Sequence, residues 1–303
     1  MSKLFITLQA KGGVGKSYVS SILAQYLQDA NLSVHCIDTD TTNPTLRRYK
    51  PLNCQYLNLA TDHVINPRAF DELVEIVSGA PTDRHFVVDV GSNGFQPFMA
   101  YAVENDLFAV LEDLGVDVIV NSVIAGGPDV DETLSSTMAV LEHTRVSTLI
   151  WLNAHLGALE FKHRPIQHLD LFDPFKSRIL GWVTLPKYAA TTFGQDIEHM
   201  LKERWTFNET LERLTLMPQM RIRKAKRDLW SQLDQVFFPL PQAPSVFDAR
   251  ANAQRDQRRS DRRLSADRRS ATRSSAWDSV SIGRGQATPR QRHKRSLTTC
   301  RPS

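Results

Sequence analysis

The segment KGGVGKS, from Lys11 to Ser17, decides the fold of this chain. It directly follows a short apolar run, Leu4 to Leu8, and it opens a stretch with helical periodicity. A strand, a glycine-rich turn and a helix in this order form a phosphate-binding P-loop. Because Gly12, Gly13 and Gly15 carry no Cβ, the backbone there can curl and point its N–H groups at phosphate oxygens. The start of the helix adds further N–H groups and the positive end of its dipole.

Two side chains of this segment carry the expected chemistry. Lys16 is placed to reach the β- and γ-phosphates of a nucleotide, and the Ser17 hydroxyl is placed to bind Mg²⁺. With Val14 and the flanking Tyr18 they complete the predicted phosphate site. A glycine-rich turn with an accidental lysine is the alternative. It is disfavoured because the spacing and the flanking structure match the motif together.

Length and composition predict one enzyme-sized domain. The chain has 303 residues, and no stretch approaches the roughly 18 uninterrupted apolar residues of a membrane span. It runs straight into the first predicted strand, so we expect no signal peptide. The three cysteines, Cys36, Cys54 and Cys300, form no CxxC pair. This favours a reducing, cytoplasmic location and argues against a disulfide framework or an iron–sulfur cluster.

Charge separates the chain into two parts. Residues 249–303 contain 15 Lys and Arg against four Asp, a net charge of +11, whereas the other 248 residues contain 22 basic and 29 acidic residues, a net charge of −7. Pro239 opens PLPQAPS, which reads as an extended linker. Beyond it, the low-complexity repeats DQRRS, DRRLS and ADRRS offer too few apolar residues to offset the entropy of ordering. We therefore expect a domain over 1–238 and a linker with a disordered Arg-rich tail over 239–303.

Strand and helix patterns alternate along the predicted domain. This alternation predicts an α/β fold with a doubly wound, mostly parallel sheet and helices on both faces. Predicted strands are Leu4–Leu8, Ser33–Asp38, Phe86–Val90, Asp117–Ile124, Thr148–Asn153 and Ile179–Thr184. Predicted helices include Ser17–Ala30, Pro67–Ser78 and Val130–His143.

Acidic residues close two of these strands. Asp38 and Asp40 lie two residues apart at the end of the second strand, so their side chains share a face at the sheet edge where nucleotides bind. An ordinary solvated strand end is the alternative, and the preceding P-loop makes it the weaker one. The segment FVVDVG, from Phe86, resembles a Walker B element. In it Asp89 would hold Mg²⁺ through water, and the Gly91 N–H would contact the γ-phosphate.

One departure from the usual P-loop motif points to a family. Ala10 replaces the first glycine, and a second lysine, Lys11, follows it. This arrangement resembles the deviant Walker A box of the ParA/MinD family of P-loop ATPases. The resemblance implies that ATP is the nucleotide, that Lys11 reaches across a dimer interface to the partner's nucleotide, and that ATP controls homodimerisation. It also implies that Asp40 orients the attacking water and assists around Mg²⁺, with Asp38 as a structural acid. The relatives usually follow this pair with Pro-Gln, whereas this chain has Thr41-Thr42.

The same resemblance suggests residues for the adenine base. The family often uses an Asn at the position of Asn153, after the strand STLIWLN, and Pro186 after the last strand would line the base. A turn-forming Asn and a strand-ending Pro are equally good alternatives.

A narrower resemblance is to TraL-type conjugal-transfer proteins, which are ParA-like ATPases. It rests on FITLQAKGGVGKS followed by Tyr18, on AQYL from Ala24, and on IDTDTTNPT with a following Tyr49-Lys50. Three function hypotheses follow. The first is a slowly hydrolysing dimerisation switch that acts with the conjugation machinery. The second is a partition ATPase that binds DNA without sequence preference, and the third is a nucleotide-gated interaction module with negligible turnover.

Two basic regions are candidate contacts to nucleic acid. The first is RIRKAKR, from Arg221, for which a solvated helix face is the alternative. The second is the tail, which we expect to bind polyanions weakly and without sequence preference, with a solubilising or unused extension as an almost equally good alternative. The apolar residues Ile222, Leu229 and Leu233 form a stripe opposite the cations of the first region. We expect this stripe to pack against the core and not against a membrane.

Overall fold

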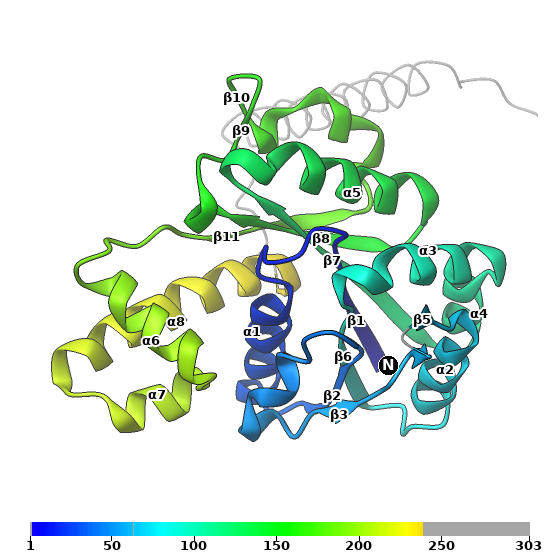
Figure 1. Cartoon of the computed structure of the whole chain (residues 1–303), viewed down its shortest axis with the longest axis horizontal. Helices are drawn as coiled ribbons and strands as arrows, with labels where there is room; N and C mark the ends of the chain where they lie inside the picture. Colours follow the sequence, from blue (N-terminus) through cyan, green and yellow to red (C-terminus); the bar gives the residue numbers. More distant parts are fainter. Residues whose placement is uncertain (1, 63, 239–303) are drawn as a thin grey trace, which may run out of the picture. The chain divides into compact units, whose positions relative to one another are not determined.

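A seven-stranded parallel sheet forms the centre of the domain (Figure 1). The computed structural model describes residues 2–62 and 64–238. The sheet order is β11-β8-β7-β1-β6-β2-β3, and every pairing between its neighbours is parallel. Its strands are β1 (Ser2–Leu8), β2 (Ser33–Asp38), β3 (Gln55–Tyr56), β6 (Arg84–Asp89), β7 (Val116–Ala125), β8 (Ser147–Asn153) and β11 (Ile179–Leu185). Two antiparallel hairpins lie outside it, β4 (Ala60–Thr61) with β5 (Val64–Ile65), and β9 (Glu160–Phe161) with β10 (Arg164–Pro165).

The helices connect the strands and cover the sheet. The α-helices are α1 (Lys16–Asp29), α2 (Phe70–Ser78), α3 (Phe95–Glu104), α4 (Leu107–Asp113), α5 (Val130–His143), α6 (Phe193–Glu203), α7 (Phe207–Arg213) and α8 (Leu216–Phe237). Short 3₁₀ helices are η1 (Leu46–Arg48), η2 (Lys50–Leu52), η3 (Pro67–Ala69), η4 (Ser92–Gly94), η5 (Gly127–Asp129), η6 (Ala154–Leu156), η7 (Ile166–His168) and η8 (Asp170–Phe175). Among the described residues, no helix is long and apolar enough to cross a membrane.

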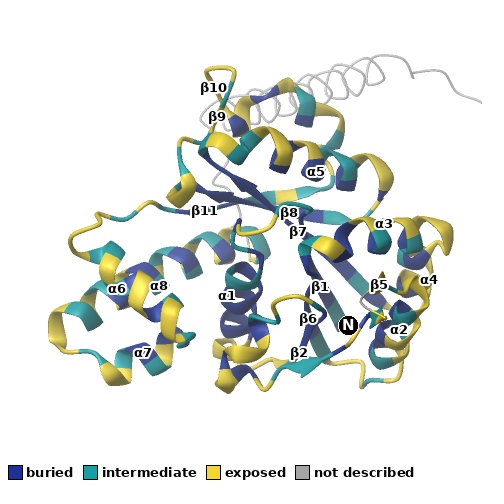
Figure 2. Cartoon of the chain, in the orientation of Figure 1, coloured by how far each residue is buried: buried dark blue, intermediate teal, exposed yellow. Residues whose placement is uncertain are grey.

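Side chains of β1 alternate between two hydrophobic cores. Phe5 packs into a core with α1 and α8, whereas Leu4 and Ile6 point to the opposite face, into a core with α2 and α3. A smaller core lies between the β7–β8 part of the sheet, α5 and η8. Figure 2 shows the buried residues along the strands and along the inner sides of these helices. The predicted doubly wound α/β fold is therefore confirmed.

One predicted helix differs in detail from the sequence-based expectation. The predicted helix from Pro67 to Ser78 is a 3₁₀ turn followed by α2, because the Asn66 side chain caps the turn by accepting a hydrogen bond from the Arg68 N–H. The stripe of Ile222, Leu229 and Leu233 is buried in the core, as expected. The linker and tail predicted over 239–303 lie outside the described residues.

The sheet order places the candidate site. Strand β1 is flanked by β6 on one side and by β7 on the other, so the connections diverge on either side of β1. Ligands in open α/β sheets bind at this point, beyond the carboxyl ends of the strands. The P-loop, Asp38, Asp40 and Asp89 all follow strands that end at this edge.

Candidate functional site: a P-loop with two lysines

Left-handed glycines shape the loop after β1. Gly13 and Gly15 have φ angles of 78° and 102°, which side chains with a Cβ rarely adopt, and Gly15 directly precedes α1. Val14 between them is buried. The predicted phosphate-binding loop is thus present in geometry, with the first N–H groups of α1 at its end.

Lys16 lies within this loop. Its Nζ donates a hydrogen bond to the carbonyl oxygen of Lys11 at 2.8 Å, and only 8% of the residue is exposed. Burial lowers the pKa of Lys16, and the nearby carboxylates of Asp89 and Asp40 oppose that shift. A buried ammonium that bonds to one carbonyl has donors left over, so it is suited to bind phosphate oxygens.

Asp38 and Asp89 form a buried acidic pair behind the loop. They are register partners on the adjacent strands β2 and β6, and each is at most 1% exposed. Burial raises the pKa of Asp38 to about 6. It raises that of Asp89 to about 7, with the charge of Asp38 adding to the shift. Ser20 Oγ donates a hydrogen bond to Asp89 Oδ1 at 3.1 Å, and both Ser17 and Ser20 oppose the rise in the pKa of Asp89.

This donor set fits Mg²⁺. Hydroxyl and carboxylate oxygens are the ligands that Mg²⁺ prefers, and the single ammonium of Lys16 beside Asp89 offsets only part of the charge of this buried carboxylate pair. The described residues contain no cluster of three or more His, Cys, Asp or Glu that could hold a metal alone. Mg²⁺ is commonly bound by one or two carboxylates together with substrate phosphates, which suits Ser17 and Asp89 beside a P-loop.

Asp40 is held in the segment after β2. Its Oδ1 accepts hydrogen bonds from the N–H groups of Thr42 and Asn43, both at 2.9 Å. Gly91 approaches it so closely that a Cβ there would lie 2.8 Å from Asp40 Cγ. The absence of a side chain at Gly91 therefore lets the segments after β2 and β6 meet. These are the segments predicted to carry the water-orienting acid and the γ-phosphate contact.

Thr41 and Thr42 take part in the same junction. The Asn93 amide donates to the hydroxyls of both, at 3.0 and 3.1 Å. These threonines stand at the positions where ParA/MinD-family proteins usually have Pro-Gln. Their side chains link the segment of Asp40 to the segment after Gly91. Sequence reasoning did not find Asn93, because an exposed Asn in a turn is common.

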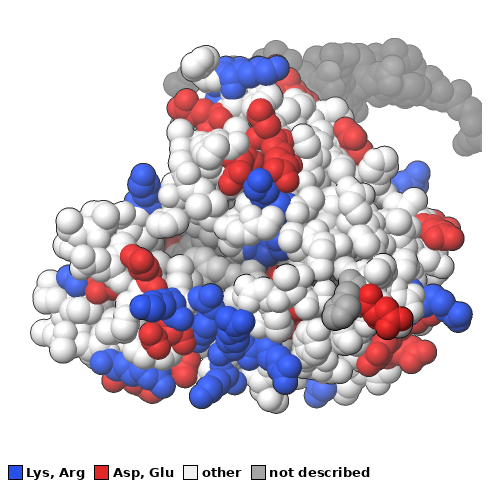
Figure 3. All heavy atoms as spheres, viewed as in Figure 1, with Lys and Arg blue, Asp and Glu red and all other residues white. Residues whose placement is uncertain are grey.

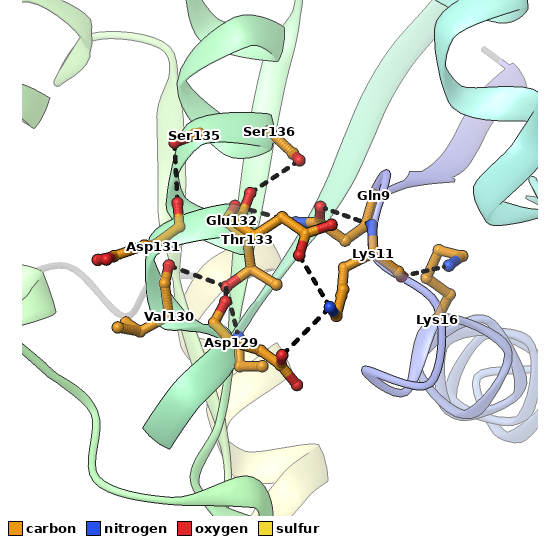
Figure 4. Close-up of polar contacts among 11 residues, drawn as sticks. Gln9, Lys11, Lys16, Asp129, Val130, Asp131, Glu132, Thr133, Ser135 and Ser136 are labelled. Carbon is orange, nitrogen blue, oxygen red and sulfur yellow. Dashed lines mark hydrogen bonds and ion pairs between the residues drawn. The ribbon is translucent and has the colours of Figure 1, made fainter.

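Lys11 points away from Lys16 and toward the start of α5 (Figure 4). Its Nζ lies 2.8 Å from Glu132 Oε2 and 3.3 Å from Asp129 Oδ1. Hydrogen bonds to Glu132 and Asp129 raise the pKa of Lys11. Figure 3 shows acidic side chains gathered over this end of α5. The two lysines of one loop thus have different surroundings, one buried by the loop and one held at the surface by acids.

Gln9 anchors the beginning of the loop to β7 and α5. Its buried side chain donates to the carbonyl oxygens of Val123 and Thr133 at 2.8 and 3.0 Å, and its Oε1 accepts from the Lys11 N–H. Lys11 is therefore tied through its backbone to the element that carries Glu132. In the sequence, Gln9 is a polar residue directly after an apolar strand. This signal could have indicated its role, but the sequence-based prediction did not use it.

A cavity of about 500 Å³ opens on the other side of the loop. Asn153 and Pro186, the two residues predicted for the base, both line it, and so do Tyr18 and Tyr188. The Asn153 amide is also a structural link: it donates to the Val14 carbonyl oxygen at 3.0 Å and accepts from the His155 N–H. Other lining residues come from α6 and α8, namely Gly194, Ile197, Glu198, Leu201, Lys202 and Leu229.

The cations of RIRKAKR are largely engaged within the domain. Arg221 pairs with Asp196, Lys226 with Asp29, and Lys224 with Asp228. Paired charges attract polyanions less than free ones do, so the structure favours this segment as a candidate nucleic-acid contact less than its sequence does.

Comparisons with known proteins agree with this geometry. Two proteins named TraL from Escherichia coli are 35% and 34% identical to this chain over 238 residues, which cover 77% of this chain and 98% of each relative. The chain belongs to the TraL family. A family model described as ParA, NUBPL iron-transfer P-loop NTPase, matches residues 1–82 of this TraL-family chain. The predicted membership of the ParA/MinD-type P-loop proteins, close to TraL, is thereby confirmed.

Solved structures that match this chain have low sequence identity to it. MinD from Pyrococcus horikoshii complexed with Mg-ADP gives a TM-score of 0.47 at 16% identity, covering 80% of this TraL-family chain and 100% of that one. A putative plasmid partition protein from Borrelia burgdorferi bound to AMPPNP gives a TM-score of 0.39 at 17% identity, with coverages of 78% and 100%.

Proposed function

We propose that this TraL-family chain is a slowly hydrolysing ATPase that binds ATP with Mg²⁺ and uses it to form a homodimer. The observation that carries the proposal is the pair of lysines on one P-loop. Lys16 lies buried beside Asp89, and Lys11 lies outside the loop in contact with Asp129 and Glu132. One lysine suffices to bind phosphates in its own subunit, so the second has another task.

Phosphate binding is assigned to the loop and the start of α1. The N–H groups after Gly12 surround the phosphates, and Lys16 exchanges its bond to the Lys11 carbonyl for bonds to phosphate oxygens. Ser17 and Asp89 would hold Mg²⁺, which would supply charge neutralisation for the phosphates. The purine base enters the cavity that Asn153 and Pro186 line.

Hydrolysis is assigned to the junction after β2 and β6. Asp40 orients the attacking water, and the Gly91 N–H contacts the γ-phosphate, so the junction responds to the difference between ATP and ADP. Asp40 already accepts two backbone hydrogen bonds, which fix its carboxylate in one orientation. Turnover is therefore slow without a partner that adjusts this segment.

Dimerisation is assigned to Lys11. When ATP is bound, Lys11 leaves Glu132 and Asp129 and reaches the phosphates of the nucleotide in the partner subunit. Both ion pairs are partly exposed, and such pairs contribute little, so the cost of leaving them is small compared with contacts to phosphate. Family resemblance implies the same role for this lysine.

For the cellular role we propose conjugal plasmid transfer in the cytoplasm, with a partner from the conjugation machinery. The TraL relatives support this assignment. Partition with DNA binding by RIRKAKR is the weaker candidate, because four of its five cations have an acidic partner within the domain. An ATP-dependent electrophoretic shift with this domain would favour partition.

The nucleotide assignment is tested by calorimetric titration with Mg-ATP and by phosphate release. We expect Lys16→Ala to abolish binding, and Asp40→Ala to bind within about threefold of the wild type while losing hydrolysis. Lys50→Ala and Asp83→Ala, which change exposed residues of the same types elsewhere, are the matched controls. Wild-type turnover by Asp40→Ala would remove its catalytic assignment, and unchanged binding by Lys16→Ala would remove the nucleotide site.

A further inference from the structure

The first turns of α8 expose three large apolar side chains. Leu216, Met217 and Met220 are 70%, 62% and 51% exposed. Together such side chains offer on the order of 300 Å² of apolar surface, the size of patches that mark interaction sites. Methionine adapts its shape to a partner, and methionines are common at binding surfaces for that reason.

The same face of α8 continues as a cationic surface. Arg223, Lys224 and Arg227 are exposed and follow the apolar residues at helical spacing. The opposite face, with Ile222 and Leu229, is buried in the core. The face from Leu216 to Arg227 therefore has an apolar end and a basic end, over about 16 Å of helix.

This basic end has unbalanced charge. Lys224 pairs with Asp228 at 2.7 Å, and Arg227 lies 3.8 Å from the same carboxylate. Arg223 has no ion pair with any described residue. Two of these three cations share one acidic side chain and the third has none among the described residues, so the surface attracts acidic groups.

We propose that this face of α8 docks an amphipathic helix of a partner protein, with apolar residues at one end of its contact face and Asp or Glu at the other. The partner's apolar residues cover Leu216, Met217 and Met220, and its carboxylates meet Arg223 and Arg227. A helix is the element whose side chains recur every three to four residues on one face, as these do. The proposal is independent of the nucleotide site.

Charge and the position of the apolar residues argue against the other ligands that this face of α8 could bind. Residues 249–303 carry a net charge of +11, so the chain's own tail is repelled by the basic end. A second copy in a symmetric contact would bring like charges together. A membrane-surface helix needs an apolar stripe along its length, whereas the long stripe of α8 is buried and the exposed apolar residues occupy one end. DNA would use the cations and leave the methionines without a role.

The test measures binding of two synthetic amphipathic helical peptides to the full chain by fluorescence anisotropy. One peptide carries leucines on one half of its face and glutamates on the other half, and the second has lysines in place of the glutamates. We expect the wild type to bind the acidic peptide about tenfold more tightly than the lysine peptide. Arg223→Glu/Arg227→Glu reverses this preference, and Met217→Gln/Met220→Gln weakens acidic-peptide binding about tenfold. Val103→Gln/Arg68→Glu, equally exposed on other elements, changes neither.

Two further titrations test whether this face binds DNA or a membrane surface instead. The wild type and Arg223→Glu/Arg227→Glu are titrated with a DNA duplex and with phosphatidylglycerol vesicles, and thermal unfolding checks that each variant folds. Equal binding of both peptides by the wild type overturns the proposal, and so does unchanged acidic-peptide binding by Met217→Gln/Met220→Gln. DNA or vesicle binding that depends on Arg223 and Arg227, without acidic-peptide binding, assigns the face to that ligand and also overturns it.

Discussion

Lys11 and Glu132 form an ion pair within one chain, with 2.8 Å between Nζ and Oε2. The lysine that the family resemblance assigns to a dimer interface is therefore held by its own subunit, together with Asp129 at 3.3 Å. Acids that hold Lys11 compete with any phosphate in trans. In the proposed dimer, the strength of this hold would set how readily ATP drives association.

Releasing Lys11 should favour the dimer. We expect Asp129→Asn/Glu132→Gln to strengthen ATP-dependent dimerisation by about three- to tenfold, because two partly exposed ion pairs no longer compete. Lys11→Ala should bind ATP as a monomer and fail to dimerise. Asp131→Asn, an exposed acid on the same turn, is the control. A weaker dimer in the double variant would show that these acids support the interface and do not oppose it.

Asp89 should make the nucleotide-free protein less stable as pH rises. Its pKa is about 7 in the folded chain and 3.8 as the ordinary value, so the folded state holds a proton between these pH values that the unfolded state has lost. Stability therefore falls as pH rises through this window. Asp38, whose pKa is raised to about 6, lowers stability in the same direction as pH rises. The charge of Lys16 opposes the rise in the pKa of Asp89.

Removal of this charge should stabilise the protein at pH 8. We expect Asp89→Asn to raise the free energy of unfolding by on the order of 2 kcal/mol, and the gain to shrink toward pH 4 as the wild type takes up its proton. Thermal unfolding across this pH range measures it, with Asp83→Asn as the exposed control. A gain that stays constant with pH would contradict the assignment. The same variant should lose the Mg²⁺ dependence of ATP binding.

Asn153 should act on the loop as well as on the base. Its Nδ2 holds the Val14 carbonyl oxygen at 3.0 Å, so Asn153→Ala leaves a buried carbonyl unpaired, at about 1–3 kcal/mol. We expect ATP and GTP binding to weaken by a similar factor of about 5–20. Titration with both nucleotides measures this. A variant that loses only its preference for adenine would instead confirm Asn153 as a base-reading residue.

Deletion of residues 249–303 should leave ATP binding intact, because the P-loop domain ends before them. The same deletion should reduce affinity for DNA at low salt, since 15 cations are lost with it. The deletion is titrated with a DNA duplex at two salt concentrations. DNA binding as tight as that of the full chain would assign the contact to Arg221 and its neighbours.

The parts of the site that sequence reasoning found are local. A strand, a glycine-rich turn and Lys16 fall within one short segment, and Asp38 and Asp89 each close an apolar strand. Such signals need no knowledge of the tertiary structure. Even strand ends were close: β7 spans Val116–Ala125, one residue longer at each end than predicted.

The features of the site and fold that sequence reasoning missed depend on contacts between distant residues or on short helices. Glu132 follows Lys11 by 121 residues, and acids in the first turn of a helix are expected on any helix. The Asn93 link to Thr41 and Thr42 likewise joins residues about 50 positions apart. Helix α7 was detectable, because Thr206 and Glu209 form a capping box with the spacing T-x-x-E.

The central claim is that ATP joins two copies of this chain through Lys11. Sedimentation velocity of Asp40→Ala, which should bind ATP without hydrolysing it, tests this most directly. With Mg-ATP we predict a dimer, without nucleotide a monomer, and with Lys11→Ala/Asp40→Ala a monomer under both conditions. A monomer of Asp40→Ala at saturating Mg-ATP would contradict the account and leave Lys11 as a local charge beside the P-loop.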